Sequence, residues 1–99
     1  MYEIPKKVKI GGMTYKVNIT PHMSAHDGRV GEISYQDACI NILPGHRPYM
    51  YLTLLHEVFH ALYMHLGHTD HDEKEIEQLA AAFYALVVDN PKLFERVKP

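Results

Sequence analysis

The hydrophobic pattern of this 99-residue chain changes its period at residues 44–48 (PGHRP), and this change constrains the fold more than any other feature. Before it, apolar and polar residues alternate in short runs, which is typical of β-strands. After it, apolar residues recur every three or four positions, which is typical of helices. The sequence therefore predicts an α+β fold in which a small sheet is followed by helices.

Four short strands are expected before this change, arranged as two hairpin-like pairs in a small antiparallel sheet. The first pair is Val8 to Ile10 and Met13 to Thr20, joined by Gly11-Gly12, a dipeptide that supplies the positive φ angles of a tight turn. The second pair covers residues 30–36 and 38–43. We expect the strand at 38–43 to form the edge of the sheet along which an extended peptide pairs.

Two main helices are expected after the change. The first begins near Tyr49, with Pro48 in its first turn, and ends near Gly67. Its predicted apolar stripe consists of Leu52, Leu55, Phe59, Leu62 and Leu66.

The second helix runs to about Asp89, where Asn90-Pro91 ends it. Thr69, Asp70 or Asp72 can cap its start, and Asp70 and Glu73 have the spacing of a capping box. Its predicted inward-facing residues are Ile76, Ala80, Phe83 and Val87.

Length and composition favour a single domain over residues 1–99 with one modest core. Ten Lys and Arg oppose twelve Asp and Glu without a basic stripe, so nucleic-acid binding is not expected. Cys39 is the single cysteine, which excludes an internal disulfide and fits a reducing compartment. The start lacks a signal-peptide pattern, and the longest apolar run, at 79–88, is too short to span a bilayer. We therefore expect a cytoplasmic protein without membrane contact, and the sequence leaves its oligomeric state open.

His56, Glu57 and His60 form an H-E-x-x-H pattern inside the first expected helix. Residues four apart on a helix differ by about 40° and one turn, so two such imidazoles point the same way and can share one metal ion. Glu57 lies beside them, close enough to reach a metal-bound water without binding the metal. A solvated polar face is the alternative, but the other side, with Leu54 and Val58, is also apolar. The pattern therefore predicts two metal ligands and one general base.

A third ligand is required, because a catalytic zinc takes three protein ligands and leaves a fourth position for water. The second helix offers Glu73, Glu75 and Glu77. Glu77 flanks the inward-facing stripe, Glu75 points away, and Glu73 lies in the first turn, where the helix dipole favours a carboxylate without any metal. Glu77 is therefore the preferred third ligand, with Glu73 as the alternative.

The segment "TLLHEVFHAL", followed by "EQLAAAFYALVVDNP", resembles the ImmA/IrrE family of zinc metallopeptidases, which are common in phages and mobile elements. Glu77, Ala80 and Phe83 match the pattern of that family's second helix, and the hairpin "GEISYQDACINI" is similar to one in short phage members. The resemblance covers roughly residues 8 to 91.

This resemblance implies a minimal gluzincin-like site in which His56, His60 and Glu77 hold Zn²⁺ and Glu57 is the catalytic base. One departure is the short loop between the motifs, since Glu77 follows His60 by 17 positions (77 minus 60). The family's larger members also carry further domains, so the biological role does not transfer with the site.

We therefore expect a zinc metallopeptidase whose partner is a peptide or protein substrate. Zinc would activate a water and polarise the scissile carbonyl, while Glu57 takes the proton of that water. Tyr63 and Tyr84 are candidates for stabilising the oxyanion, because each shares a helix face with an expected ligand. Three further histidines are candidates for contacts around the metal site or with the substrate: His65, His68 and His71.

The alternative function is a catalytically inactive, zinc-stabilised binding or regulatory module. Such a structural site would need no base beside the metal and would take a fourth protein ligand, from Asp70, Asp72 or a loop histidine. A metal-free interaction protein is a third alternative.

Overall fold

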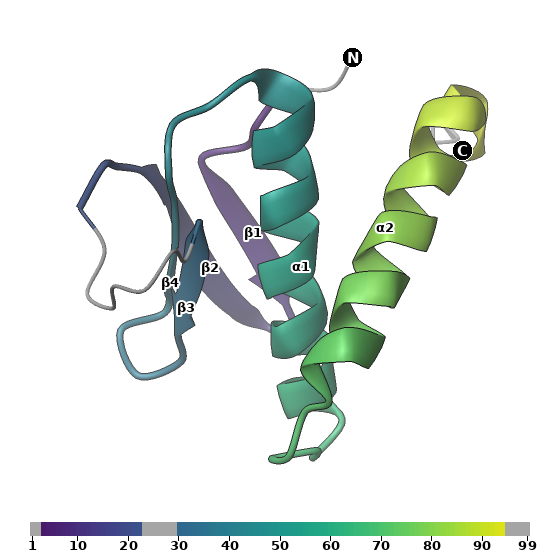
Figure 1. Cartoon of the computed structure of the whole chain (residues 1–99). Helices are drawn as coiled ribbons and strands as arrows, with labels where there is room; N and C mark the ends of the chain where they lie inside the picture. Colours follow the sequence, from purple (N-terminus) through teal and green to yellow (C-terminus); the bar gives the residue numbers. More distant parts are fainter. Residues whose placement is uncertain (1–2, 23–29, 95–99) are drawn as a thin grey trace, which may run out of the picture.

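The computed structural model describes residues 3–22 and 30–94, and it shows an α+β fold built in three layers (Figure 1). A four-stranded sheet is covered on one face by helix α1 (Arg47–His65). Helix α2 (Glu73–Asp89) packs on the side of α1 that faces away from the sheet, and a short 3-10 turn, η1 (Pro91–Phe94), follows it. The expected fold class, a small sheet followed by two main helices, is confirmed.

The sheet contains β1 (Lys7–Ile10), β2 (Met13–Ile19), β3 (Gly31–Ser34) and β4 (Cys39–Ile42) in the spatial order β1-β2-β4-β3. Both expected hairpins are present, since β1 pairs antiparallel with β2 and β3 with β4. The turn at Gly11-Gly12 has φ angles of 58° and 86°, as expected.

The two hairpins meet through a parallel pair, β2 and β4, so the sheet is mixed rather than wholly antiparallel. A tight turn fixes the pairing inside each hairpin, whereas the contact between hairpins depends on how the longer connection from β2 to β3 returns. The sequence pattern does not encode that return.

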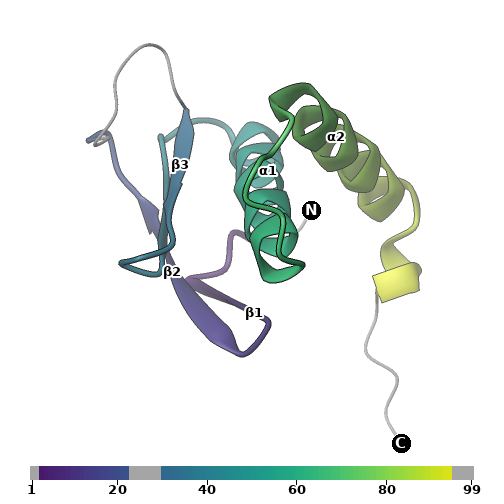
Figure 2. The same ribbon diagram turned by 90° about the horizontal axis from the view of Figure 1, so that it is seen from below.

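The expectation that the strand at 38–43 forms a sheet edge is wrong. β4 lies between β2 and β3, and its Ile40 and Ile42 are fully buried. The edge strand next to β4 is β3, which lies beside α1 (Figure 2), and β1 forms the other edge. Because an inner strand has both neighbours hydrogen-bonded, any peptide that pairs with the sheet on this side must use β3.

The core lies between the sheet and α1. Alternate residues of the inner strands face the helix, with Tyr15 and Val17 on β2 and Ile40 on β4 buried. From α1, Leu54 and Ala61 complete this cluster. The side of α1 opposite to the predicted leucine stripe therefore covers the sheet.

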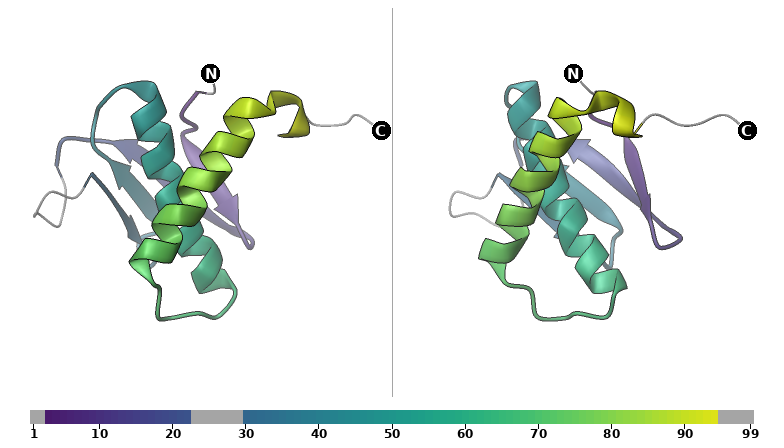
Figure 3. Two further views of the ribbon diagram at one scale, coloured as in Figure 1. Left: turned by 45° about the vertical axis from the view of Figure 1, so that its right-hand side comes forward. Right: turned by 90° about the vertical axis from the view of Figure 1, so that its right-hand side faces the viewer.

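The predicted leucine stripe instead faces α2. Leu55 is buried, and the ring of Phe59 meets that of Phe83 edge-on with centroids 5.8 Å apart. Leu62 and Leu66 are exposed, because α2 begins beside the middle of α1 and the last turn of α1 extends past it (Figure 3). As a middle layer, α1 must be apolar on two sides. Neither α1 nor α2 combines the length and the apolar character needed to cross a membrane.

The start of α2 is fixed by Asp72, whose carboxylate accepts hydrogen bonds from the backbone N–H groups of Lys74 and Glu75. Of the three expected caps, Asp72 is therefore the one used. Glu73 is consequently the first residue of α2 and not the partner of Asp70 in a capping box. This cap determines which carboxylate stands nearest to α1.

Candidate metal centre

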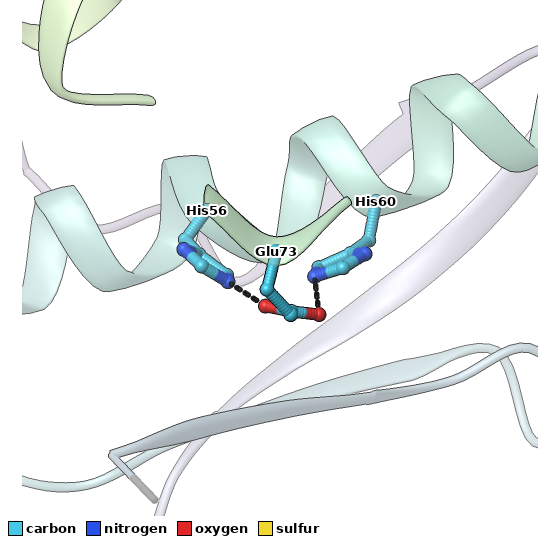
Figure 4. A group of neighbouring side chains, drawn as sticks. All are labelled: His56, His60 and Glu73. Atoms are coloured by element: carbon cyan, nitrogen blue, oxygen red, sulfur yellow. Dashed lines mark hydrogen bonds and ion pairs between the residues drawn. The ribbon is translucent and has the colours of Figure 1, made fainter. Parts of the chain in front are cut away.

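Three side chains from the two helices converge on one point (Figure 4). The Nε2 atom of His56 lies 3.1 Å from Oε1 of Glu73, and Nε2 of His60 lies 2.9 Å from Oε2 of the same carboxylate. One ligand atom from each of the three residues lies within 4.8 Å of the others. The H-E-x-x-H spacing therefore brings both imidazoles to one place, as the sequence predicted.

The separation of these atoms suits a small divalent cation. Ligand atoms about 2.0 Å from a tetrahedral zinc ion are about 3.3 Å apart, so the carboxylate would need to move outward by a few tenths of an ångström. Two imidazoles and one carboxylate are also a ligand set of catalytic zinc sites. Since 70% of the Glu73 side chain is exposed, it is free to make this adjustment.

The charge states of the ligands also suit a metal. Burial lowers the pKa of His60, although the negative charge of Glu73 acts in the opposite direction. Burial on its own would raise the pKa of Glu73, but its close contacts with His60 and His56 outweigh this effect and lower it. A neutral imidazole beside an ionised carboxylate is the state that binds a metal ion.

The third position of the cluster holds Glu73 and not the preferred Glu77. Glu77 is exposed and lies one turn further along α2, where it lines the same cleft. The sequence-based choice followed the inward stripe of α2 and attributed the first-turn position of Glu73 to the helix dipole alone. Recognising Asp72 as the cap would have placed Glu73 at the first helical position, beside the motif.

The cluster opens into a cleft of about 690 Å³ between β3, α1 and the start of α2. Its described walls include Glu32, Glu57, Glu73 and Glu77 and contain no Lys or Arg, so their potential attracts cations. Glu57 is 7% exposed and lies on this wall beside the two imidazoles. It is not one of the three clustered residues.

Gly31 on β3 has no side chain, and the carboxylate of Glu57 lies in the space that a side chain at this position would fill. A β-carbon at position 31 would lie 2.5 Å from Cγ2 of Thr53 and 3.1 Å from Oε2 of Glu57. The sequence pattern gave no signal for this role, because the requirement comes from the approach of β3 to α1.

Gly31→Ala is therefore expected to destabilise the protein by about 1–3 kcal/mol, as overpacking does in a well-packed site. Thr53→Ser should relieve most of this cost, since it removes the nearest methyl group and keeps the hydroxyl that donates to the carbonyl oxygen of Tyr49. Urea unfolding of the two single variants and the double variant measures the coupling. If the changes in unfolding free energy of the two single variants simply add in the double variant, residue 31 does not crowd Thr53 and the explanation is wrong.

The tyrosines predicted to stabilise an oxyanion do not line the cleft. The hydroxyl of Tyr63 donates to Glu75 at 2.8 Å, and the ring of Tyr84 packs against that of Tyr51. Tyr35, at the end of β3, lines the cleft instead. Burial, followed by the charges of neighbouring Tyr15, Glu57 and Glu73, raises the pKa of Tyr35 to about 12, so it remains a hydrogen-bond donor at neutral pH.

The remaining predicted contacts have separate roles. His71 forms a hydrogen bond with His60, whereas the ring of His65 lies against Gly11 in the first hairpin turn. His46 caps α1 by accepting from the backbone N–H of Tyr49. Asp70 and Asp72 do not join the three clustered ligands. His26, to which no role was assigned, lies outside the described residues.

These residues therefore form a group of three potential metal ligands with an adjacent buried carboxylate in an acidic cleft. Comparison with models of known protein families, with curated proteins and with solved structures finds no match for this chain.

Proposed function

We propose that this protein is a zinc-dependent metallopeptidase in which His56, His60 and Glu73 bind the metal and Glu57 is the general base. The observation that carries the proposal is the convergence of three ligand atoms, one from each metal-binding residue, beside a buried fourth carboxylate on the wall of an open cleft. A bound zinc ion would supply a lowered pKa for a coordinated water and polarisation of the scissile carbonyl.

Glu57 takes the proton from the attacking water and returns it to the leaving amine. Its burial beside Thr53 and Gly31 restricts its side chain to the cleft wall. Tyr35, the residue after β3, lines the same cleft, and its neutral hydroxyl is a candidate donor to the developing oxyanion.

The substrate is a peptide that pairs in extended form with the edge strand β3. Residues Val30 to Ile33 line the cleft beside the motif helix, and among the described strands β3 has a neighbour on one side only, β4. Backbone hydrogen bonds to a sheet edge bind an extended chain whatever its side chains. A peptide held there passes directly along the metal ligands.

The number of ligands favours this function over a zinc-stabilised binding module. A structural zinc site is closed by four protein ligands, whereas the cluster among the described residues supplies three. A purely structural site also needs no base beside the metal, the position that Glu57 occupies.

Removal and return of zinc provide the direct test. Protein stripped with a chelator should lose cleavage of a mixed fluorogenic peptide library by at least about 100-fold and regain it with one equivalent of zinc. Circular dichroism of the stripped protein controls for unfolding. Zinc binding without cleavage of any peptide would favour the binding module, and failure to bind zinc would contradict both functions.

A further inference from the structure

A chain of hydrogen bonds runs from the metal site outward into the loop before α2. The Nδ1 atom of His60 lies 2.8 Å from Nδ1 of His71, and Nε2 of His71 lies 2.7 Å from the backbone oxygen of His68. The two imidazole rings are nearly parallel, with an interplanar angle of 21° and centroids 5.1 Å apart. The outward-facing nitrogen of His60 is thus linked through His71 to a fixed backbone group.

The backbone oxygen at the end of this chain determines where the hydrogens lie. A carbonyl oxygen only accepts, so Nε2 of His71 must donate to it. A neutral imidazole carries one N–H, which leaves Nδ1 of His71 as an acceptor and makes Nδ1 of His60 the donor. The Nε2 atom of His60 then carries a lone pair, and this is the atom 2.9 Å from the carboxylate of Glu73.

This arrangement leaves two acceptors facing each other at the metal site. A lone pair on His60 and a carboxylate oxygen of Glu73 are brought into stable contact by a cation that both can bind. The hydrogen bond to His71 therefore keeps the hydrogen of His60 on Nδ1, and Nε2 is left with the lone pair that a metal ligand needs.

We propose that His71 is a positioning residue that holds His60 in the Nδ1–H tautomer and so presents the Nε2 lone pair of His60 to the metal. The inference rests on the metal site of the proposed function and deepens it, because it assigns the group that orients one ligand. It does not depend on which substrate is cleaved.

The position of His71 is itself supported by neighbouring groups. The ring of Tyr63 meets that of His71 nearly edge-on, with centroids 5.6 Å apart, and the Tyr63 hydroxyl donates to Glu75 in the first turn of α2. Tyr63, predicted as an oxyanion stabiliser, thus packs against the positioning residue. Its contact with Glu75 ties this group to the helix that supplies Glu73.

Two substitutions separate the hydrogen bond from the packing. His71→Asn places a side-chain oxygen at the position of Nδ1 and keeps an acceptor for His60, whereas His71→Leu has similar size and no acceptor. We expect His71→Leu to weaken zinc binding by about 10- to 100-fold, the usual cost of losing an outer partner of a metal-binding histidine. His71→Asn should restore affinity to within about threefold of wild type. Competition with a chromophoric chelator measures both affinities in the full chain, and circular dichroism checks folding.

A spectroscopic signature tests the tautomer directly. In the zinc-loaded wild type labelled with ¹⁵N, the Nδ1–H proton of His60 should be visible and coupled through the hydrogen bond to Nδ1 of His71. Equal zinc affinity in all three proteins, or a hydrogen on Nδ1 of His71 instead of His60, would overturn the assignment while leaving the metal site intact. Failure of the wild type to bind zinc would overturn the metal site together with this inference.

Discussion

Glu57→Gln is expected to reduce kcat/KM for peptide cleavage by about 10²- to 10⁴-fold while one equivalent of zinc remains bound. Glutamine has nearly the volume of glutamate, so it fits the site where the side chain is 7% exposed and close to Gly31. It retains a carbonyl oxygen that accepts a hydrogen bond but cannot take a proton at neutral pH. Steady-state cleavage of a fluorogenic peptide, with zinc content measured on the same samples, determines both quantities.

The matched control for this variant is Glu77→Gln, which makes the same chemical change at another carboxylate on the wall of the cleft. Its zinc content and cleavage should stay within about twofold of wild type, because Glu77 is exposed and is neither one of the three clustered residues nor the proposed base. Full activity in Glu57→Gln would assign the base to a different group. Loss of zinc from Glu57→Gln would mean that Glu57 supports the metal rather than the proton transfer.

The sequence predicted the part of the site that one helix determines. His56 and His60 lie four residues apart on α1, and helical geometry alone directs both imidazoles to one point. Glu57 follows from the same geometry. The hairpins were predictable for a similar reason, since the Gly11-Gly12 turn fixes the pairing of its own two strands.

The features that the sequence did not predict depend on how separate strands and helices pack against one another. The parallel contact between β2 and β4, and therefore the edge position of β3, is set by a connection whose path no periodic pattern encodes. The sequence left open which neighbour the apolar stripe of α1 meets: Leu55 is buried and Phe59 contacts Phe83 of α2, whereas Leu62 and Leu66 are exposed. A helix that is apolar on two sides gives no local signal of which side meets which neighbour.

The choice between Glu73 and Glu77 is the clearest case of this limit. Residues four apart on α2 share a face, so periodicity cannot decide which of the two approaches α1. The decision comes from the length of the connection after α1 and from the cap at Asp72, which together place the first turn of α2 beside the imidazoles. Register between two helices is a tertiary property.

Glu73→Ala is accordingly expected to raise the dissociation constant for zinc by more than about 100-fold, beyond the usual cost of losing an outer partner of a ligand. Glu73 contacts both imidazoles and is the carboxylate in the cluster of three, so its removal leaves two neutral nitrogen ligands. A 100-fold loss corresponds to about 2.8 kcal/mol of binding free energy. Competition titration with a chromophoric chelator measures it, and the rise of Tm on adding zinc gives an independent reading.

Glu77→Ala is the matched variant, because both glutamates are exposed, lie on the same face of α2 and carry the same charge. It should change the dissociation constant for zinc by less than about threefold, since Glu77 lies outside the cluster. The reverse result, with tight binding in Glu73→Ala and weak binding in Glu77→Ala, would contradict the proposed ligand set. It would mean that α2 advances along α1 by one turn, about 5.4 Å, when zinc binds. The pair of variants therefore decides both the third ligand and whether the two helices keep their register on binding the metal.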